Sequence, residues 1–170
     1  NERIAAALTP SKLTTRCPGA VCLGDAVQIK HASGRCLARQ MIQEPSLFDR
    51  MTSQLCEQAD FASATSCANP LRRSTFMLEK CPEKFLSMQD DAFDDDRLRY
   101  GQKILISAAD CETYLTVAEN ALKDSGQVAF FSQDISYPSV WQLTPLDPGQ
   151  LFEAQGNCSL LLALCLILCF

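Results

Sequence analysis

Two stretches of the chain repeat one pattern, and this repeat constrains the fold more than any other feature of the sequence. Each copy has an apolar residue, a glycine and a polar residue in succession, followed by alternating apolar positions; the glycines are Gly24 and Gly101. A second element then recurs, in which serine, an aromatic residue and leucine stand at alternate positions, from Ser74 in one copy and from Ser139 in the other. An internal repeat of this kind favours an architecture assembled from similar units.

Each copy predicts the same order of local structure, a β-hairpin followed by a separate strand. Apolar residues at every second position are typical of strands with one buried face. Gly34 suits a turn position with positive φ, which places the first chain reversal at residues 31–34. The strand-forming stretches are residues 21–39, 98–106 and 114–117, the two aromatic strands from Ser74 and from Ser139, a compact run at 128–132 and a short run at 85–88.

Strand-rich units that each end near an aromatic residue favour an all-β fold, and more closely a β-trefoil, in which three lobes close one barrel without exposed edges. Trp141, the only tryptophan, is predicted to lie in the core or to close a lobe. Two lobes are recognisable and the third is incomplete. The predicted divisions are a lead-in at 1–19, a β-trefoil-like domain at 20–156 with lobe one at 20–82, lobe two at 97–145 and the start of lobe three at 146–156, and an apolar tail at 157–170.

The charge of the chain narrows the classes of partner. Its 170 residues carry a net charge of −5, and lysine and arginine are scattered rather than clustered. Nucleic acids and anionic membrane surfaces attract basic patches, so the sequence argues against both as partners.

The two ends of the chain look unlike the rest. The final run, 160–170, is wholly apolar and shows no period of two, yet it is shorter than the about 20 residues that a membrane-spanning helix needs. We expect a faulty gene model to be the origin of this tail, with a cryptic membrane anchor as the alternative. Because the chain begins with Asn1 rather than Met, we expect it to be a fragment.

The ten cysteines are open to two interpretations. With no C-x-x-C pair and a single histidine, the spacing argues against structural zinc. The even number would permit a disulfide framework. Several cysteines, among them Cys36 and Cys111, stand where strands prefer small apolar residues, so we favour reduced thiols in a cytosolic protein.

Two features that could carry chemistry are interpreted as structural. His31 is a candidate general base, but no local signature supplies a partner for it, so we expect it to be a turn residue. The acidic run 90–96 could suggest calcium, but the glycine and glutamate that an EF-hand loop requires are missing. We therefore expect a solvated acidic loop, no metal, no cofactor and no catalytic residue.

Two segments are the candidates for contact with a partner. Leu47, Met51 and Leu55 recur at helical spacing in residues 46–58, which predicts an amphipathic helix inserted into lobe one. This apolar stripe packs either on its own domain or on a partner. The basic pair Arg72 and Arg73 precedes the first aromatic strand and would suit an acidic partner, the alternative being a solvated strand end.

Several short words of the sequence resemble one protein family. They are Arg-Arg-Ser-Thr-Phe at 72–76, Leu-Arg-Tyr-Gly-Gln at 98–102, Tyr-Leu at 114–115, Leu-Asp-Pro at 146–148, and Trp141. In this order and spacing they resemble the family of cilia- and flagella-associated protein 161, over residues 17–156. The word Leu-Gly-Asp-Ala-Val at 23–27 is similar to the strand opening of that family, although Leu23 stands where the family favours tyrosine.

The resemblance implies a MIR-like β-trefoil that acts as a microtubule inner protein. Such a protein lines the lumen of the A-tubule of the axonemal doublet in cilia and flagella, binds tubulin and neighbouring inner proteins, and stabilises the doublet for motility. The resemblance carries no catalytic residue and no cofactor with it. The loss of the family pattern after Gly156 leaves the role of the third lobe open.

One other class of function stays open at this point. A β-trefoil of the secretory pathway could bind carbohydrate, and lectins of this type commonly carry a Gln-x-Trp word in each lobe. Here Ser139 stands in the glutamine position before Trp141. An enzyme is the weakest interpretation, because the sequence has neither a phosphate-binding glycine loop nor a metal cluster.

Overall fold

The computed structural model describes residues 2–31, 34–40, 60–66, 69–88, 95–109, 111–117 and 129–144. Within these ranges the chain is mostly β-strand, which confirms the all-β class. The elements are α1 (Glu2–Ala7), β1 (Ala26–Val27), β2 (Arg35–Gln40), β3 (Asp60–Ser66), the 3₁₀ turn η1 (Arg72–Ser74), β4 (Phe76–Lys80), η2 (Glu83–Phe85), β5 (Lys103–Ala108), β6 (Tyr114–Val117), β7 (Ala129–Ser132), η3 (Tyr137–Ser139) and β8 (Trp141–Gln142).

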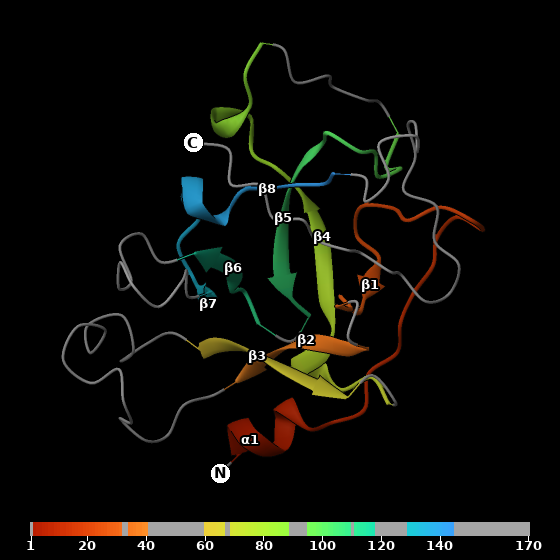
Figure 1. Ribbon diagram of the computed structural model, residues 1–170, viewed down its shortest axis with the longest axis vertical. Coiled ribbons are helices and arrows are strands. Elements are labelled where there is room, and N and C mark those ends of the chain that lie inside the picture. Colours follow the sequence, from red (N-terminus) through yellow and green to blue (C-terminus); the bar gives the residue numbers. More distant parts are fainter. Residues whose placement is uncertain are drawn as a thin grey trace, which may run out of the picture.

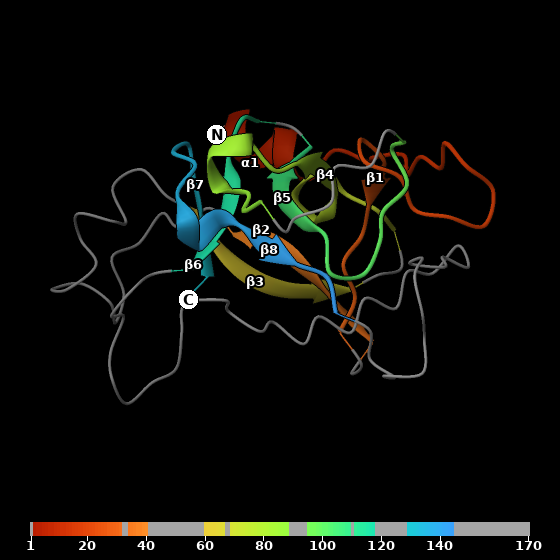
Figure 2. The same cartoon turned by 90° about the horizontal axis from the view of Figure 1, so that it is seen from above.

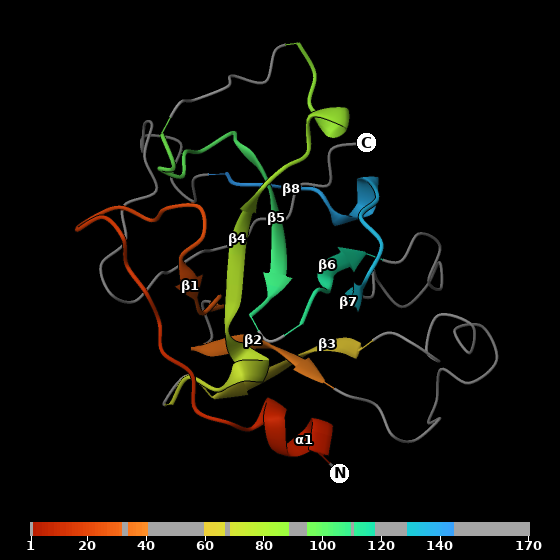
Figure 3. The same cartoon turned by 180° about the vertical axis from the view of Figure 1, so that it is seen from behind.

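The strands form one antiparallel sheet built around a central pair. Its order is β1-β4-β5-β6-β7-β3-β2, and β8 pairs with β5 beside this path. Strands β4 and β5 run side by side through the middle, with β1 on one flank and β6 and β7 on the other (Figure 1 and Figure 2). Helix α1 lies at the end of the molecule where β2 and β3 pair (Figure 3). Each strand pair described here is antiparallel, as expected for strands joined by hairpins and short connections.

The predicted repeat is visible in the register of the strands. Strand β1 pairs with β4 so that Val27 faces Phe76. Strand β5 pairs with β8 so that Ile104 faces Trp141. Both pairs join the residue three positions after the repeated glycine to the aromatic residue two positions after the repeated serine. The two copies therefore use one pairing scheme, although their sequences differ at most positions.

The two predicted hairpins are also confirmed. In the first, Lys30 bridges Cys36, and the backbone N–H of Leu37 donates to the carbonyl of Ile29 at 2.8 Å. Its turn uses Gly34 with φ of +82°, a conformation that suits glycine. In the second, β5 pairs with β6 through Ser107 and Tyr114. Strands β3 and β7 then join the two hairpins to each other.

The core lies between these elements and draws on both copies. Phe76 and Phe131 stack with their ring centroids 5.7 Å apart. Trp141 is 3% exposed and donates its indole N–H to the carbonyl of Leu115 at 2.8 Å. Burying the ring while pairing its polar atom is the arrangement that stabilises a core tryptophan. The prediction of Trp141 as a core residue is confirmed. The buried cluster comprises Val21, Leu23, Val27, Ile29, Phe76, Leu78, Leu98, Ile104, Ile106, Ala108, Leu115, Val117, Phe131, Trp141 and Leu143.

One predicted strand is wrong. Residues 85–88 do not form a strand, because the 3₁₀ turn η2 follows Pro82 and ends at Phe85. The N–H of Leu86 donates back to the carbonyl of Glu83 at 2.9 Å. A backbone that closes hydrogen bonds within its own turn does not present them to a neighbouring strand.

Several predictions fall outside the described residues. They include the amphipathic helix at 46–58 with Leu47, Met51 and Leu55, and the apolar tail at 157–170.

Candidate functional site

The repeated glycines occupy the third position of two turns with matched geometry. Gly24 has φ of +82° and Gly101 has φ of +84°. Their N–H groups donate to the carbonyls of Leu78 and Leu143, and both distances are 2.7 Å. Each carbonyl belongs to the leucine of the serine–aromatic–leucine element in the same copy. The turn and the aromatic strand of each copy are therefore linked directly.

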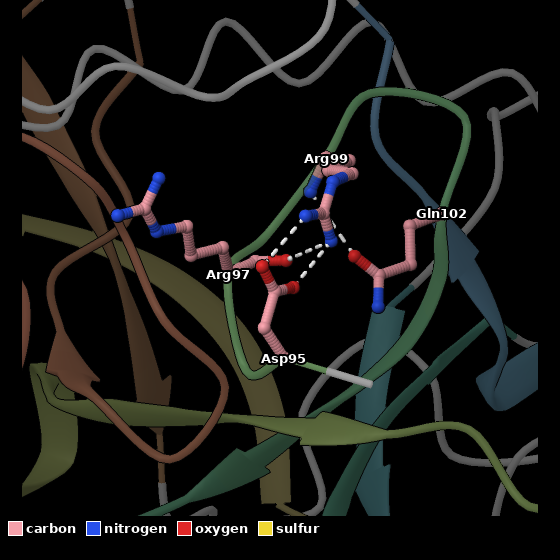
Figure 4. Close-up of polar contacts among 4 residues, drawn as sticks. All are labelled: Asp95, Arg97, Arg99 and Gln102. Carbon is pink, nitrogen blue, oxygen red and sulfur yellow. Dashed lines mark hydrogen bonds and ion pairs between the residues drawn. The ribbon is translucent and has the colours of Figure 1, made fainter. Parts of the chain in front are cut away.

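The polar residue after each glycine caps its own turn. Asp25 accepts the backbone N–H of Cys22 on Oδ2 at 2.9 Å, three residues back. Gln102 accepts the backbone N–H of Arg99 on Oε1 at 3.0 Å, again three residues back (Figure 4). A side-chain oxygen that satisfies a backbone N–H in this way stabilises a turn locally. Both side chains thus bind a backbone N–H group of their own turn rather than pointing toward a ligand.

The first turn is more deeply buried than the second. Asp25 is 1% exposed, and its other oxygen accepts the backbone N–H of Arg16 at 3.0 Å. Gln102 is only partly buried. The extra contact arises because the lead-in passes beside the first turn, where Arg16 also approaches Gly24. A buried carboxylate with two backbone donors is well compensated for its lost hydration.

The two turns meet at a seam between the copies. Cys22 bridges Arg97, and the N–H of Leu23 donates to the carbonyl of Asp96 at 2.7 Å. On the other side of this bridge, the N–H of Leu98 donates to the carbonyl of Val21 at 2.8 Å. We call residues 21–25 together with 95–102 the twin-turn seam. Here residues far apart in the sequence lie side by side.

Charged side chains line the outer edge of the twin-turn seam. Arg99 donates from Nη1 and Nη2 to the two oxygens of Asp95 at 2.6 and 2.8 Å. Figure 4 shows Arg99 between Asp95 and Gln102, while the side chain of Arg97 extends away from them. The hydrogen bonds from Arg99 lower the pKa of Asp95. Asp95 was assigned to a solvated acidic run; it is exposed as expected, but it is paired rather than isolated.

Two buried serines repeat the same task in the two copies. The hydroxyl oxygen of Ser74 accepts the N–H of Leu71 at 3.2 Å, and that of Ser139 accepts the N–H of Ser136 at 3.3 Å. Both serines are 0% exposed. Each caps the 3₁₀ turn from which the aromatic strand begins. The serine that recurs in the sequence therefore has a structural role, which is to cap this turn.

The predicted basic pair occupies η1, at the end of the molecule near the lead-in. The N–H of Arg72 donates to the carbonyl of Thr9 at 3.0 Å, and the Arg72 side chain is exposed. Arg73 is partly buried, and its Nε makes no hydrogen bond within the part of the chain described here. The structure thus separates the two arginines into one that is open to solvent and one that faces inward. The other candidates for contact with a partner, Leu47, Met51 and Leu55, lie outside the described residues, so their role stays a prediction.

One pair of residues was missed by the sequence analysis. Arg39 is 4% exposed on β2, and its Nη1 donates to the sulfur of Cys111 at 2.6 Å. Cys111 lies in the turn between β5 and β6, where its sulfur is 3.1 Å from the hydroxyl of Thr113. No signal in the sequence joins Arg39 to a residue so far along the chain.

Three features remain to be described: the single histidine, groups of metal-binding side chains, and helices that could span a membrane. His31 is exposed in the first hairpin turn, where its backbone N–H donates to the carbonyl of Arg35 at 2.7 Å. Over the ranges given above, no three histidine, cysteine, aspartate or glutamate side chains come close enough together to hold a metal ion. Among the helices described, none is long and apolar enough to cross a membrane.

Comparison with known proteins adds no assignment. The chain matches no protein-family model, and no curated protein is significantly similar to it.

Proposed function

We propose that this chain is a non-enzymatic structural protein of the ciliary axoneme, a microtubule inner protein that binds tubulin in the lumen of the doublet A-tubule. The proposal begins from the family resemblance carried by residues 72–76, 98–102 and Trp141. In the described structure these residues belong to the capped serine turn, the repeated glycine turn and the aromatic strand. The sequence motifs that carry the resemblance therefore contain residues that form the repeated turns and strands.

We further propose that the fold is a β-trefoil with two lobes and an incomplete third. The support is the common pairing scheme, in which β1–β4 and β5–β8 share one register. The strand pairs β2–β3 and β6–β7 occupy corresponding places in the two copies and meet through β3 and β7. Repeated lobes of this kind around a shared core are the defining feature of the trefoil family of barrels.

The observation that best supports a structural role is how the repeated polar residues are used. Asp25 and Gln102 accept backbone N–H groups within their own turns, and Ser74 and Ser139 do the same in theirs. A binding or catalytic site needs polar groups that point toward a ligand. The repeated positions instead stabilise the scaffold, which is the property that a lattice protein requires.

The proposed contact surface includes η1 and the segment that carries Leu47, Met51 and Leu55. A net charge of −5 does not favour an approach to the acidic surface of tubulin, so local basic groups must compensate. Arg72 is the exposed member of its pair and is the first candidate for that role. Repetition of a weak contact along a periodic lattice would then supply the avidity.

Salt extraction of axonemes tests the proposal. The tagged chain is expressed in ciliated cells, and isolated doublets are washed with salt that removes proteins attached outside. The proposal expects the chain to stay with the doublets. The Arg72→Glu variant is expected to be retained about tenfold less, a loss of about 1.4 kcal/mol in binding. Lys80→Glu makes the same change of charge at an exposed position on the far end of β4 and is expected to behave like the unmodified chain.

One result would overturn the proposal, and a second would overturn the contact surface assigned to it. The first is release of the unmodified chain into the soluble or membrane fraction before the salt wash. Recovery from the secretory pathway with affinity for a sugar column would favour the carbohydrate-binding alternative instead. The second is equal retention of the Arg72→Glu and unmodified chains, which would remove η1 from the contact surface.

A further inference from the structure

A short loop beside the twin-turn seam is closed by a single carboxylate. The two oxygens of Asp25 accept the backbone N–H groups of Arg16 and Cys22, at 3.0 and 2.9 Å. Between these two anchors the chain reverses at Gly19, which has φ of +78°, and the N–H of Ala20 donates to the carbonyl of Cys17 at 3.3 Å. Both ends of the loop are therefore fixed to one side chain.

The loop brings two thiols together. Cys17 bridges Ala20 across the turn, and side chains two residues apart along an extended chain point to the same face. Cys22, two residues beyond Ala20, accordingly lies on the face of Cys17, and the Cys17 side chain acts on the Cys22 thiol by raising its pKa. Cys17 is partly buried and Cys22 is 1% exposed, and both are free thiols.

We propose that Cys17 and Cys22 are a redox pair that closes to a disulfide when a small disulfide such as oxidised glutathione is present. Cys17, the more accessible sulfur, attacks the glutathione disulfide as a thiolate, forms a mixed disulfide and releases one glutathione. Cys22 then gives up its proton and attacks the Cys17 sulfur, which releases the second glutathione. Two protein thiols are oxidised and one glutathione disulfide is reduced, so electrons and protons balance.

The surroundings of Cys22 set the order of these two steps. Burial, the hydrogen bond with Cys17 and the nearby charges of Cys17, Asp25 and Asp96 raise the pKa of the Cys22 thiol to about 11. A thiol in this state is a poor first nucleophile at neutral pH. It lies on the face of the loop that carries Cys17, so it can act once Cys17 carries the glutathione.

Closing the bond would join the lead-in to the seam between the copies. Cys22 bridges Arg97, so a disulfide to Cys17 would tie residues 16–17 to a contact that holds both copies together. Cross-linking limits the freedom of the unfolded chain and raises stability. The oxidised chain is therefore expected to unfold at a higher urea concentration than the reduced chain.

The sequence provides a direct test, because cleavage after Arg16 and Lys30 yields a peptide of residues 17–30 that holds both cysteines and no other. The folded, full chain is equilibrated with mixtures of reduced and oxidised glutathione, blocked with N-ethylmaleimide in denaturant, and digested with trypsin. The proposal expects the peptide to be two hydrogen masses lighter and to carry no label. It expects Cys36 and Cys81, both buried, to be labelled at the same glutathione ratio.

Two controls make the result decisive. The Cys17→Ser chain keeps the buried Cys22 and is expected never to yield the lighter peptide. The same oxidation in denaturant is expected to scramble the pairing, because the fold no longer holds the loop. Two outcomes would overturn the proposal: a 17–30 peptide with both thiols labelled even in fully oxidised glutathione, or a peptide cross-linked to another cysteine of the folded chain.

Discussion

The turn at 22–25 and the turn at 99–102 have the same backbone conformation but differ in their surroundings. Both have a glycine at positive φ and a side-chain oxygen that caps the turn. The first is buried under the lead-in, where Asp25 holds two backbone N–H groups. The second stands at the edge, where Gln102 holds one. The comparison shows that the repeat determines local geometry, whereas the neighbouring chain determines how much each copy contributes to stability.

Removing the capping side chains should give the largest difference in stability between variants of the two turns. Asp25→Ala leaves the N–H groups of Arg16 and Cys22 without their acceptors in a buried place, and we expect a loss of about 3 kcal/mol in the free energy of unfolding. Gln102→Ala removes one partly exposed acceptor and should cost about 1 kcal/mol. Urea unfolding of both variants measures the difference.

Asp25→Asn is the matched control for the first turn. It keeps one carbonyl oxygen and replaces the other by a donor, so an intermediate loss is expected. Equal losses for Asp25→Ala and Gln102→Ala would contradict the assignment of the first turn as the more deeply buried one.

Alanine at the repeated glycines should give a smaller effect. At Gly101 a new Cβ meets nothing within 4 Å, so only the positive φ is strained, at a cost of about 1 to 2 kcal/mol. At Gly24 the new Cβ would also lie 2.8 Å from Nη2 of Arg16, so Gly24→Ala should cost slightly more.

The double variant with Arg16→Ala checks the source of that difference. It should bring the cost of Gly24→Ala, measured against the Arg16→Ala background, down to the cost of Gly101→Ala. If the difference persists without the Arg16 guanidinium, the close approach of that side chain is not its cause.

The surface pair of exposed Asp95 and partly buried Arg99 should give the smallest effect. Its hydrogen bonds lower the pKa of Asp95, so the folded chain keeps this carboxylate ionised at lower pH than the unfolded chain does. The stabilisation is present above the ordinary pKa of aspartate and is lost as the pH falls through the lowered value.

Asp95→Asn should therefore lose slightly at neutral pH and nothing in acid. The difference should shrink when salt is added, because exposed ion pairs are screened. Thermal unfolding across pH measures this. A loss as large as that of Asp25→Ala would show that Asp95 supports the fold far more than its exposure suggests.

The part of the fold that follows from local chemistry could be predicted from the sequence. Glycine at positive φ, a capping oxygen three residues after its donor, and an aromatic residue after a buried serine are all short-range patterns. The repeat also agrees with the matched registers of Val27 with Phe76 and of Ile104 with Trp141, although these pairings were not predicted from the sequence.

The remaining features depend on contacts between distant segments. Arg39 occupies a strand position that alternation would place outside, yet it is buried against Cys111. Asp25 makes a second backbone contact that Gln102 lacks, because Arg16 lies beside it. The strand predicted at 85–88 failed because its apolar letters outweighed the turn that follows Pro82. The first two outcomes have no signal within a few residues of the position concerned, whereas Pro82 was a local signal against the strand at 85–88.

Native-state hydrogen exchange at the amides of Gly24 and Gly101 tests most directly whether the second copy repeats the structure of the first. Each amide donates to the leucine carbonyl of its own aromatic strand at 2.7 Å. We predict that both are protected close to the level of global unfolding and within about tenfold of each other. Exchange of the Gly101 amide at the rate of an open loop, with Gly24 still protected, would contradict the claim that the second copy repeats the first.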